Sequence, residues 1–211
     1  MSDALTQYLV DHSAPPDELA QRLIAETAQL GGISRMQISS DEGAFLTIVT
    51  RLVGARRAIE VGTFTGYSAL CIARGLSDDG MLLCCDLSEE WTGVARRYWA
   101  EAGVARRIEL RIAPAAETLR SLPDDPMWDL AFIDADKVSY PTYWAEIVPR
   151  IRSGGAIVVD NVLRGGRVVD EGETEETVVA LRRFNDLVVA DSRVEVAMLP
   201  IRDGVTLAWK R

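Results

Sequence analysis

From residue 56 onward, short apolar segments alternate with segments of helical periodicity, and this alternation limits the possible folds more than any other feature of the sequence. Strands are expected at residues 58–61, 81–86, 108–112, 128–134 and 156–160, with closing strands at 193–198 and 204–209. Helices are expected at residues 67–74, 89–102, 115–121, 140–151 and 174–189. Repeated strand–helix units with apolar strands are typical of a mostly parallel sheet with helices on both faces, so the sequence predicts an α/β fold.

The first 54 residues have a different character, because three helices and no strand are expected there. These helices are placed at residues 3–10, 17–30 and 41–53. A chain of 211 residues is long enough for one domain with a sizeable core. We therefore expect a single domain over residues 1–211, in which a helical cap (1–54) covers an α/β core (55–211).

Composition argues against several partners and reaction classes. The net charge of −9 disfavours nucleic acid, whose phosphates are bound by basic surfaces. No stretch approaches the roughly 20 apolar residues that span a bilayer, and the first residues do not resemble a secretion signal, so we expect a cytoplasmic protein without a membrane partner. The single histidine, His12, lies near no nucleophile, and the three cysteines form no CxxC pair, which disfavours histidine-dependent nucleophilic catalysis and a zinc site.

A glycine-rich turn follows the first expected strand, with the sequence Glu60-Val-Gly-Thr-Phe-Thr-Gly66. Glycine at positions 62 and 66 allows a tight turn and a close approach to a ligand, and the following helix offers free N–H groups to an anion. Glu60 stands where a dinucleotide-binding loop has its first glycine, so a pyrophosphate is disfavoured there. A cofactor that carries an ammonium and a sulfonium suits this carboxylate better.

Asp86 ends the second expected strand, twenty residues after Gly66. An acidic side chain at this place can accept hydrogen bonds from both hydroxyls of a ribose. Glu60 and Gly62 alone could equally be an ordinary turn at a strand end. Together with Asp86, on the elements expected here, they predict a nucleoside-binding site.

Polar side chains also end the fourth and fifth expected strands, as Asp134-Ala-Asp136-Lys137 and as Asp160-Asn161. Neighbouring parallel strands lie roughly 5 Å apart, so the oxygens of Asp134, Asp160 and Asn161 can converge. Two carboxylates and an amide oxygen form a hard donor set that suits Mg²⁺. Either motif alone would more often be turn chemistry, and it is their pairing at consecutive strand ends that predicts a cation site.

These motifs resemble those of the cation-dependent class I S-adenosylmethionine O-methyltransferases, the group that contains the catechol and caffeoyl-coenzyme A O-methyltransferases. The resemblance covers nearly the whole chain and also includes the segments 36–43, 107–111 and 203–208. It implies a Rossmann-like class I methyltransferase fold, with a mostly parallel seven-stranded sheet, helices on both faces and an antiparallel C-terminal strand.

The resemblance also implies roles for individual residues. S-adenosylmethionine is expected to be bound by Ile38, Glu60, Gly62, Thr63, Ser68, Asp86, Ala115 and Asp134. The cation, Mg²⁺ or another divalent ion such as Mn²⁺ or Ca²⁺, is expected on Asp134, Asp160 and Asn161. Asp134 and Lys137 are the expected catalytic residues, with Lys137 as the base; without the aspartates, this lysine would be interpreted as a solvated surface residue. Met36 and Arg164 are expected at the substrate.

The reaction that follows is methyl transfer from S-adenosylmethionine to a hydroxyl of a small catechol-like aromatic compound. The cation would bind both oxygens of the vicinal diol and lower a hydroxyl pKa, and Lys137 would then remove the proton. Two positions depart from the family pattern: Ala44 stands where glutamine is frequent, and Arg164 stands where related bacterial sequences often have tryptophan. Arg164 could contact the substrate or be a solvated loop residue.

Three other functions are compatible with parts of this sequence. A nucleotide-dependent oxidoreductase would need the G-x-G-x-x-G motif, which is absent, and a non-catalytic binding module would not need Lys137 and the cation ligands. A metal-independent methyltransferase is the alternative most similar to the expected function, and a chelator would distinguish the two.

Relatives with an N-terminal helical segment are commonly dimers, so the resemblance also implies a symmetric homodimer.

Overall fold

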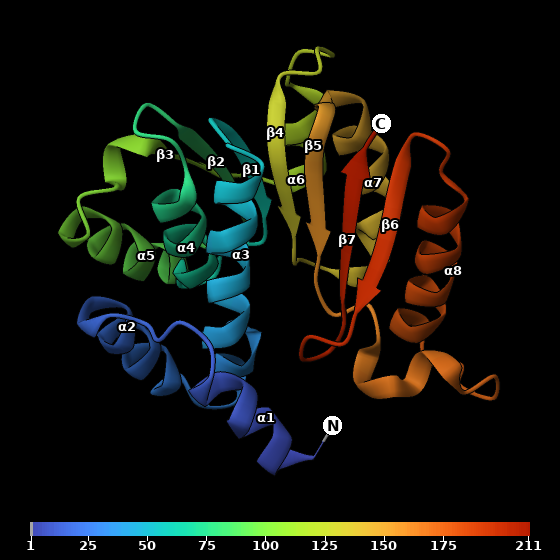
Figure 1. The fold of residues 1–211 in the computed structure, drawn as a ribbon, viewed down its shortest axis with the longest axis horizontal. Helices are drawn as coiled ribbons and strands as arrows, with labels where there is room; N and C mark the ends of the chain where they lie inside the picture. The colour runs from blue at the N-terminus through green and yellow to red at the C-terminus, as the bar shows by residue number, and fades with distance from the viewer. Residues whose placement is uncertain (1) are drawn as a thin grey trace.

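The computed structural model describes residues 2–211, which form one seven-stranded sheet in the order β3-β2-β1-β4-β5-β7-β6 (Figure 1). The strands are β1 (Arg57–Val61), β2 (Met81–Asp86), β3 (Ile108–Ile112), β4 (Trp128–Ile133), β5 (Ile151–Val159), β6 (Val194–Leu199) and β7 (Val205–Lys210). Strands β1 to β5 pair in parallel, whereas β7 pairs antiparallel to both β5 and β6. The expected mostly parallel sheet with an antiparallel C-terminal strand is confirmed.

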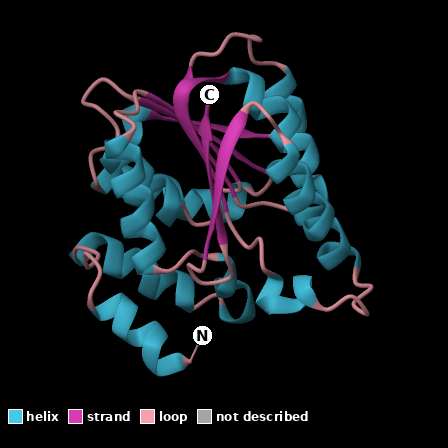
Figure 2. Cartoon of the chain, turned by 45° about the vertical axis from the view of Figure 1, so that its right-hand side comes forward, coloured by secondary structure: helices cyan, strands magenta, loops and turns pink. Residues whose placement is uncertain are grey.

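Helices cover both faces of this sheet (Figure 2). The α-helices are α1 (Asp3–Asp11), α2 (Glu18–Ala28), α3 (Ser40–Leu52), α4 (Tyr67–Gly75), α5 (Glu89–Glu101), α6 (Ala115–Arg120), α7 (Tyr140–Ile147) and α8 (Glu176–Ala190). Short 3₁₀ segments are η1 (Gly31–Met36), η2 (Ala105–Arg107), η3 (Lys137–Ser139), η4 (Val148–Arg150) and η5 (Arg164–Val169). Helices α2 to α5 pack on one face and α6 to α8 on the other.

Burial on both faces explains why the central parallel strands are mostly apolar. Along β2, Leu82 and Cys84 contribute to the core beneath α3 and α4, whereas Leu83 and Cys85 contribute to the core beneath α7 and α8. Successive side chains of a strand point to opposite faces, so a strand that is covered on both sides has no solvent-facing position. Most polar residues of these strands therefore lie at or near the strand ends.

The predicted boundary between the helix at 140–151 and the strand at 156–160 is wrong. Helix α7 ends at Ile147, η4 follows, and β5 already begins at Ile151. Pro149 explains the early end of the helix, because proline lacks an N–H group and its ring clashes with the preceding turn. The pairing of β4 with β5 then shifts register, since Trp128 pairs with Ile151 while Leu130 pairs with Ala156.

The strand order reverses between β1 and β4, and such a reversal is where open α/β sheets usually bind ligands. Strand β1 pairs with β2 on one side and with β4 on the other, so connections lead away in both directions. In such sheets a crevice opens at the carboxyl ends of the strands at this point. Gly62 lies there with φ +90°, and a Cβ atom on it would lie 2.0 Å from the carbonyl oxygen of Asp134. Only glycine lets these two strand ends approach so closely.

None of the helices within residues 2–211 is both long enough and apolar enough to span a membrane.

Candidate functional site

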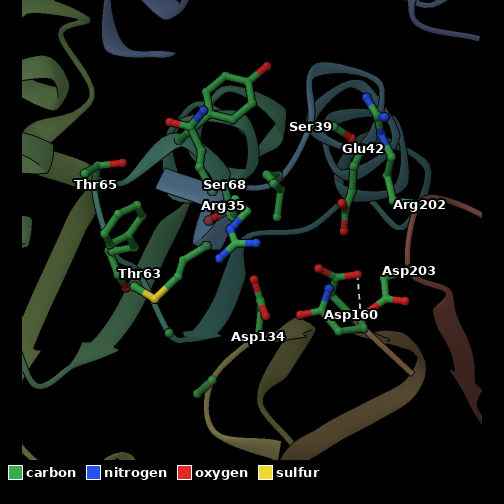
Figure 3. Close-up of a pocket in the computed structure, with 18 of the residues that line it drawn as sticks. Arg35, Ser39, Glu42, Thr63, Thr65, Ser68, Asp134, Asp160, Arg202 and Asp203 are labelled. Atoms are coloured by element: carbon green, nitrogen blue, oxygen red, sulfur yellow. Dashed lines mark hydrogen bonds between the residues drawn. The ribbon is translucent and has the colours of Figure 1, made fainter. Parts of the chain in front are cut away.

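A cavity of about 820 Å³ opens at the carboxyl ends of β1, β4 and β5 (Figure 3). The segments after these three strands form one wall, and η1 with the start of α3 forms the other. Ten of the residues singled out from the sequence line it, namely Met36, Ile38, Gly62, Thr63, Ser68, Asp134, Lys137, Asp160, Asn161 and Arg164. Glu60, Asp86 and Ala115 are not part of the lining.

Glu60 lies behind the cavity wall and is fully buried. The Thr63 hydroxyl donates to its Oε2 atom at 2.9 Å, whereas Oε1 is buried without a hydrogen-bond partner. Burial raises the pKa of Glu60 to about 7, and the neighbouring Ser68 and Thr63 side chains partly offset this rise. Glu60 therefore does not face the cavity itself but positions the Thr63 side chain, which lines it.

Asp86 holds the glycine-rich turn in place. Its Oδ2 atom accepts hydrogen bonds from the backbone N–H groups of Thr63 and Phe64, and its Oδ1 atom accepts one from Ser88, each at 2.8 Å. Phe64 has a positive φ of 50°, a conformation that such bonds help to maintain. A carboxylate offers about four acceptor positions, so Asp86 retains capacity for a ligand hydroxyl.

Ala115 begins α6, next to the carboxyl end of β3 and outside the cavity lining. The backbone N–H of Ala113 donates to the carbonyl of Asp86 at 3.0 Å and joins this segment to the end of β2. Gly62, Asp86 and Ala115 thus follow the ends of β1, β2 and β3 along one edge of the sheet. That row leads outward from the cavity.

Asp134 and Lys137 form a mostly buried ion pair at the end of β4. Lys137 Nζ lies 2.7 Å from Asp134 Oδ1, and each side chain is 13% exposed. The ammonium group also lies 5.1 Å from the centre of the Tyr140 ring. Because η3 begins at Lys137, directly after the Asp134 turn, the lysine is folded back over the strand end instead of extending into solvent.

Asp160 and Asn161 end β5 beside this pair. Asp160 is 3% exposed, and its Oδ1 atom accepts a hydrogen bond from the Asn161 backbone at 2.6 Å. Asn161 has φ +58°, which asparagine tolerates better than most residues. The Tyr140 hydroxyl donates to the Asp160 carbonyl at 2.9 Å and stabilises this turn. Burial and the adjacent Asp134 charge raise the pKa of Asp160 to about 7.

Glu42 is a site residue that the sequence reasoning missed. It lies in the first turn of α3, is only 2% exposed and points toward Asp160 (Figure 3). Burial, followed by the charges of Asp160 and Asp134, raises its pKa to about 10. The available signal was spacing: Glu42, Leu46 and Val49 occupy one buried helix face, and a carboxylate on such a face is unusual.

The donor set fits a hard divalent cation. Asp134, Asp160 and Asn161 supply two carboxylates and an amide oxygen, which is the oxygen chemistry that Mg²⁺ prefers. Within residues 2–211, no three acidic, histidine or cysteine side chains are gathered closely enough to hold a metal ion by themselves. A cation held here would draw on the amide oxygen of Asn161 as well as on the two aspartates. The Oε1 atom of Glu42 is a further buried polar atom at this cavity, and it has no hydrogen-bond partner.

Comparison with known proteins identifies the family of this chain. A family model described as O-methyltransferase matches residues 10–211. The chain belongs to the O-methyltransferase family. The expected enzyme class is thereby confirmed, and the seven-stranded sheet with its antiparallel C-terminal strand is the class I methyltransferase fold.

Individual relatives match over the full chain. Caffeoyl-CoA O-methyltransferase 5 of Nicotiana tabacum is 36% identical, and the match covers 98% of this chain and 90% of the relative. An O-methyltransferase from Bacillus cereus, solved in complex with SAH, has a TM-score of 0.88 and 31% identity over 99% of this chain and 97% of its own. An O-methyltransferase from Streptomyces achromogenes, involved in tomaymycin synthesis and solved in complex with SAM, has a TM-score of 0.89 and 29% identity over 100% and 99% of the two chains.

Proposed function

We propose that this O-methyltransferase transfers a methyl group from S-adenosylmethionine to one hydroxyl of a small aromatic vicinal diol, with the help of a divalent cation such as Mg²⁺. One observation carries the proposal. The Asp134–Lys137 ion pair and the Asp160–Asn161 turn face the same cavity as the glycine-rich turn after β1. A lysine side chain, hard oxygen ligands and a nucleoside-type turn are thus gathered around one space.

The cofactor would lie along the ends of β1 and β2, where its sulfonium supplies the methyl group. Support comes from the Gly62 close approach, from the polar Thr63 and Ser68 side chains in the lining and from the remaining acceptor capacity of Asp86. The related structures in complex with SAM and SAH favour the same ligand class. Glu60 then acts as a support for Thr63, Ile38 covers the cavity, and Ala115 lies at the outer end of the row.

Asp134, Asp160 and Asn161 would hold the cation. When bound, it would lower the pKa of an acceptor hydroxyl and orient the diol. Lys137 would remove the proton from that hydroxyl in its neutral amine form, after its ammonium group has released a proton to solvent, and Asp134 keeps its Nζ atom over the strand end. The enclosing wall of η1 then limits the approach of water and aligns the oxygen with the methyl group.

The mouth of the cavity suggests where the aromatic ring would lie. Met36 is 46% exposed although it lines the cavity, so its thioether offers an apolar contact to a ring. Arg164 also lines the cavity, has φ +48°, and donates through its Nη2 atom to Glu175 Oε1 at 3.3 Å. This pairing gives Arg164 a structural partner in addition to the substrate role proposed for it.

Methyl transfer to a panel of aromatic acceptors tests this proposal. With labelled S-adenosylmethionine, catechols are expected to be methylated, whereas phenols with a single hydroxyl are expected to react much more slowly, because they offer the cation only one oxygen. Measuring initial rates for matched catechol and phenol pairs decides the matter. Equal rates within each pair would contradict a diol-binding cation and favour the metal-independent alternative.

We also infer that the protein is a symmetric homodimer. Helix α1 has no buried residue, yet Leu5, Tyr8 and Leu9 form an apolar face that is 41–58% exposed. Light scattering is expected to give twice the 23.2 kDa mass of one chain. Leu9→Asp should shift the protein toward the monomer, while Gln7→Asp, on another face of the same helix, should not. A monomeric mass for the unmodified protein would contradict the assembly.

A further inference from the structure

Glu42 is buried without a charged partner of opposite sign. It lies on the apolar face of α3 with Leu46 and Val49, and its exposed fraction is 2%. The nearby guanidinium group of Arg202 pairs instead with the neighbouring Asp41, since Arg202 Nη2 lies 2.9 Å from Asp41 Oδ1. Transfer of a lone carboxylate out of water costs several kcal/mol unless it is paired or neutralised. A residue with this cost and no structural partner calls for a functional explanation.

The surroundings of Glu42 are acidic. Its side chain points toward Asp160, and Asp134 lies on the far side of the same space (Figure 3). Lys137 is the basic group in contact with these acids, and it is bound to Asp134. Among residues 2–211, neither Glu42 nor Asp160 forms an ion pair with a lysine or arginine. Arg35, Arg164 and Arg202 also line the cavity, but their side chains bond to the Gly32 carbonyl, Glu175 and Asp41. Of the three carboxyl groups, Asp134 is the one with a basic partner.

We propose that Glu42 is a third acidic group of the cation site, which increases the affinity for a divalent cation without being one of its three protein ligands. This inference rests on the cation dependence proposed above. Glu42 is not gathered with Asp134 and Asp160 closely enough for direct ligation by all three. A bound cation would favour the ionised form of Glu42, which would then act by its charge and by contact with Asp160. Groups that support metal ligands in this way typically change metal affinity by roughly 10–100-fold.

Manganese binding to Glu42→Gln tests the inference without any measurement of turnover. Glutamine keeps the shape and the polarity of the side chain but removes the charge. Titration with Mn²⁺ alone, followed by electron paramagnetic resonance, should show affinity reduced by roughly 10–100-fold relative to the unmodified protein. Glu42→Asp, which restores the charge on a shorter side chain, should recover part of the loss. Asp41→Asn removes the same charge from the same helical turn, but that carboxylate pairs with Arg202, so a much smaller change is expected.

Thermal unfolding of the cation-free proteins separates this role from a structural one. Removal of an unpaired buried carboxylate should leave the unfolding temperature of Glu42→Gln unchanged or raise it. A lower unfolding temperature together with weaker Mn²⁺ binding would assign Glu42 to structural support and overturn the inference. Unchanged Mn²⁺ affinity in Glu42→Gln would also overturn it, while the proposed function would stand. No Mn²⁺ binding by the unmodified protein would defeat both.

Discussion

Replacement of Lys137 by alanine is expected to lower the rate of methyl transfer by roughly 10²–10⁴-fold, the usual contribution of a positioned base. Lys137 Nζ lies 2.7 Å from Asp134 at the edge of the cavity, and its side chain is mostly buried. The variant loses the group that accepts the proton but keeps the cofactor turn, Asp160 and Asn161. Binding of S-adenosylmethionine and Mn²⁺ should therefore persist. Single-turnover rates with a catechol at neutral pH provide the measurement.

Lys137→Arg is the matched control for this experiment. A guanidinium group can preserve the ion pair with Asp134, but it stays protonated and cannot act as a base. If Lys137 removes the proton, the arginine variant should be almost as slow as the alanine variant. If Lys137 only neutralises Asp134, the arginine variant should retain most of the activity. Near-normal rates in either variant would contradict the assignment of the base.

The strand ends were predictable from the sequence for a physical reason. Strands buried on both faces contain few polar residues, so the polar side chains Asp86, Asp134 and Asp160 mark the points where the strands leave the core. Parallel pairing then brings these ends to one edge of the sheet. The start of β5 was missed, because a register shift between β4 and β5 depends on pairing partners that are distant in the chain.

Glu42 shows where sequence reasoning falls short. An acidic residue in the first turn of a helix is ordinarily explained by the helix dipole, and Asp41 and Glu42 both fit that explanation. Only the packing of α3 against the sheet separates them, since Asp41 pairs with Arg202 whereas Glu42 is buried beside Asp160. Met36 was expected at the substrate, but the 3₁₀ conformation of η1 was missed, because Gly31 and Gly32 indicated only the end of a helix.

The residues around the cofactor turn illustrate a different limit. The positions of Glu60 and Asp86 at the ends of β1 and β2 followed from the strand pattern, but the directions of their side chains did not. Glu60 turns behind the cavity to accept from Thr63, and Asp86 accepts from the backbone of the turn. These choices depend on hydrogen-bond donors brought together by the fold. A position at a strand end thus predicts which site a side chain lies near, but not which groups it contacts.

Asp160→Ala is expected to abolish cation-dependent methyl transfer and Mn²⁺ binding while S-adenosylmethionine still binds. The reason is geometric: Asp160 lies at the end of β5 beside Asn161, away from the Gly62 turn at which the cofactor is proposed to lie. With this carboxylate removed, Asp134 and Asn161 leave only two of the three proposed oxygen ligands. Calorimetry with S-adenosylmethionine and with Mn²⁺, followed by turnover of a catechol, separates the two binding events.

A chelator provides the matching experiment on the unmodified protein. Excess EDTA should stop turnover, and added Mg²⁺ should restore it, whereas the Asp160→Ala variant should not respond to Mg²⁺. Unfolding of the variant is not expected to explain its inactivity, because burial beside Asp134 already raises the pKa of Asp160 to about 7 and makes its charge costly in the cation-free protein. The cation assignment is contradicted if catechol turnover survives EDTA, or if Asp160→Ala loses S-adenosylmethionine binding together with Mn²⁺ binding.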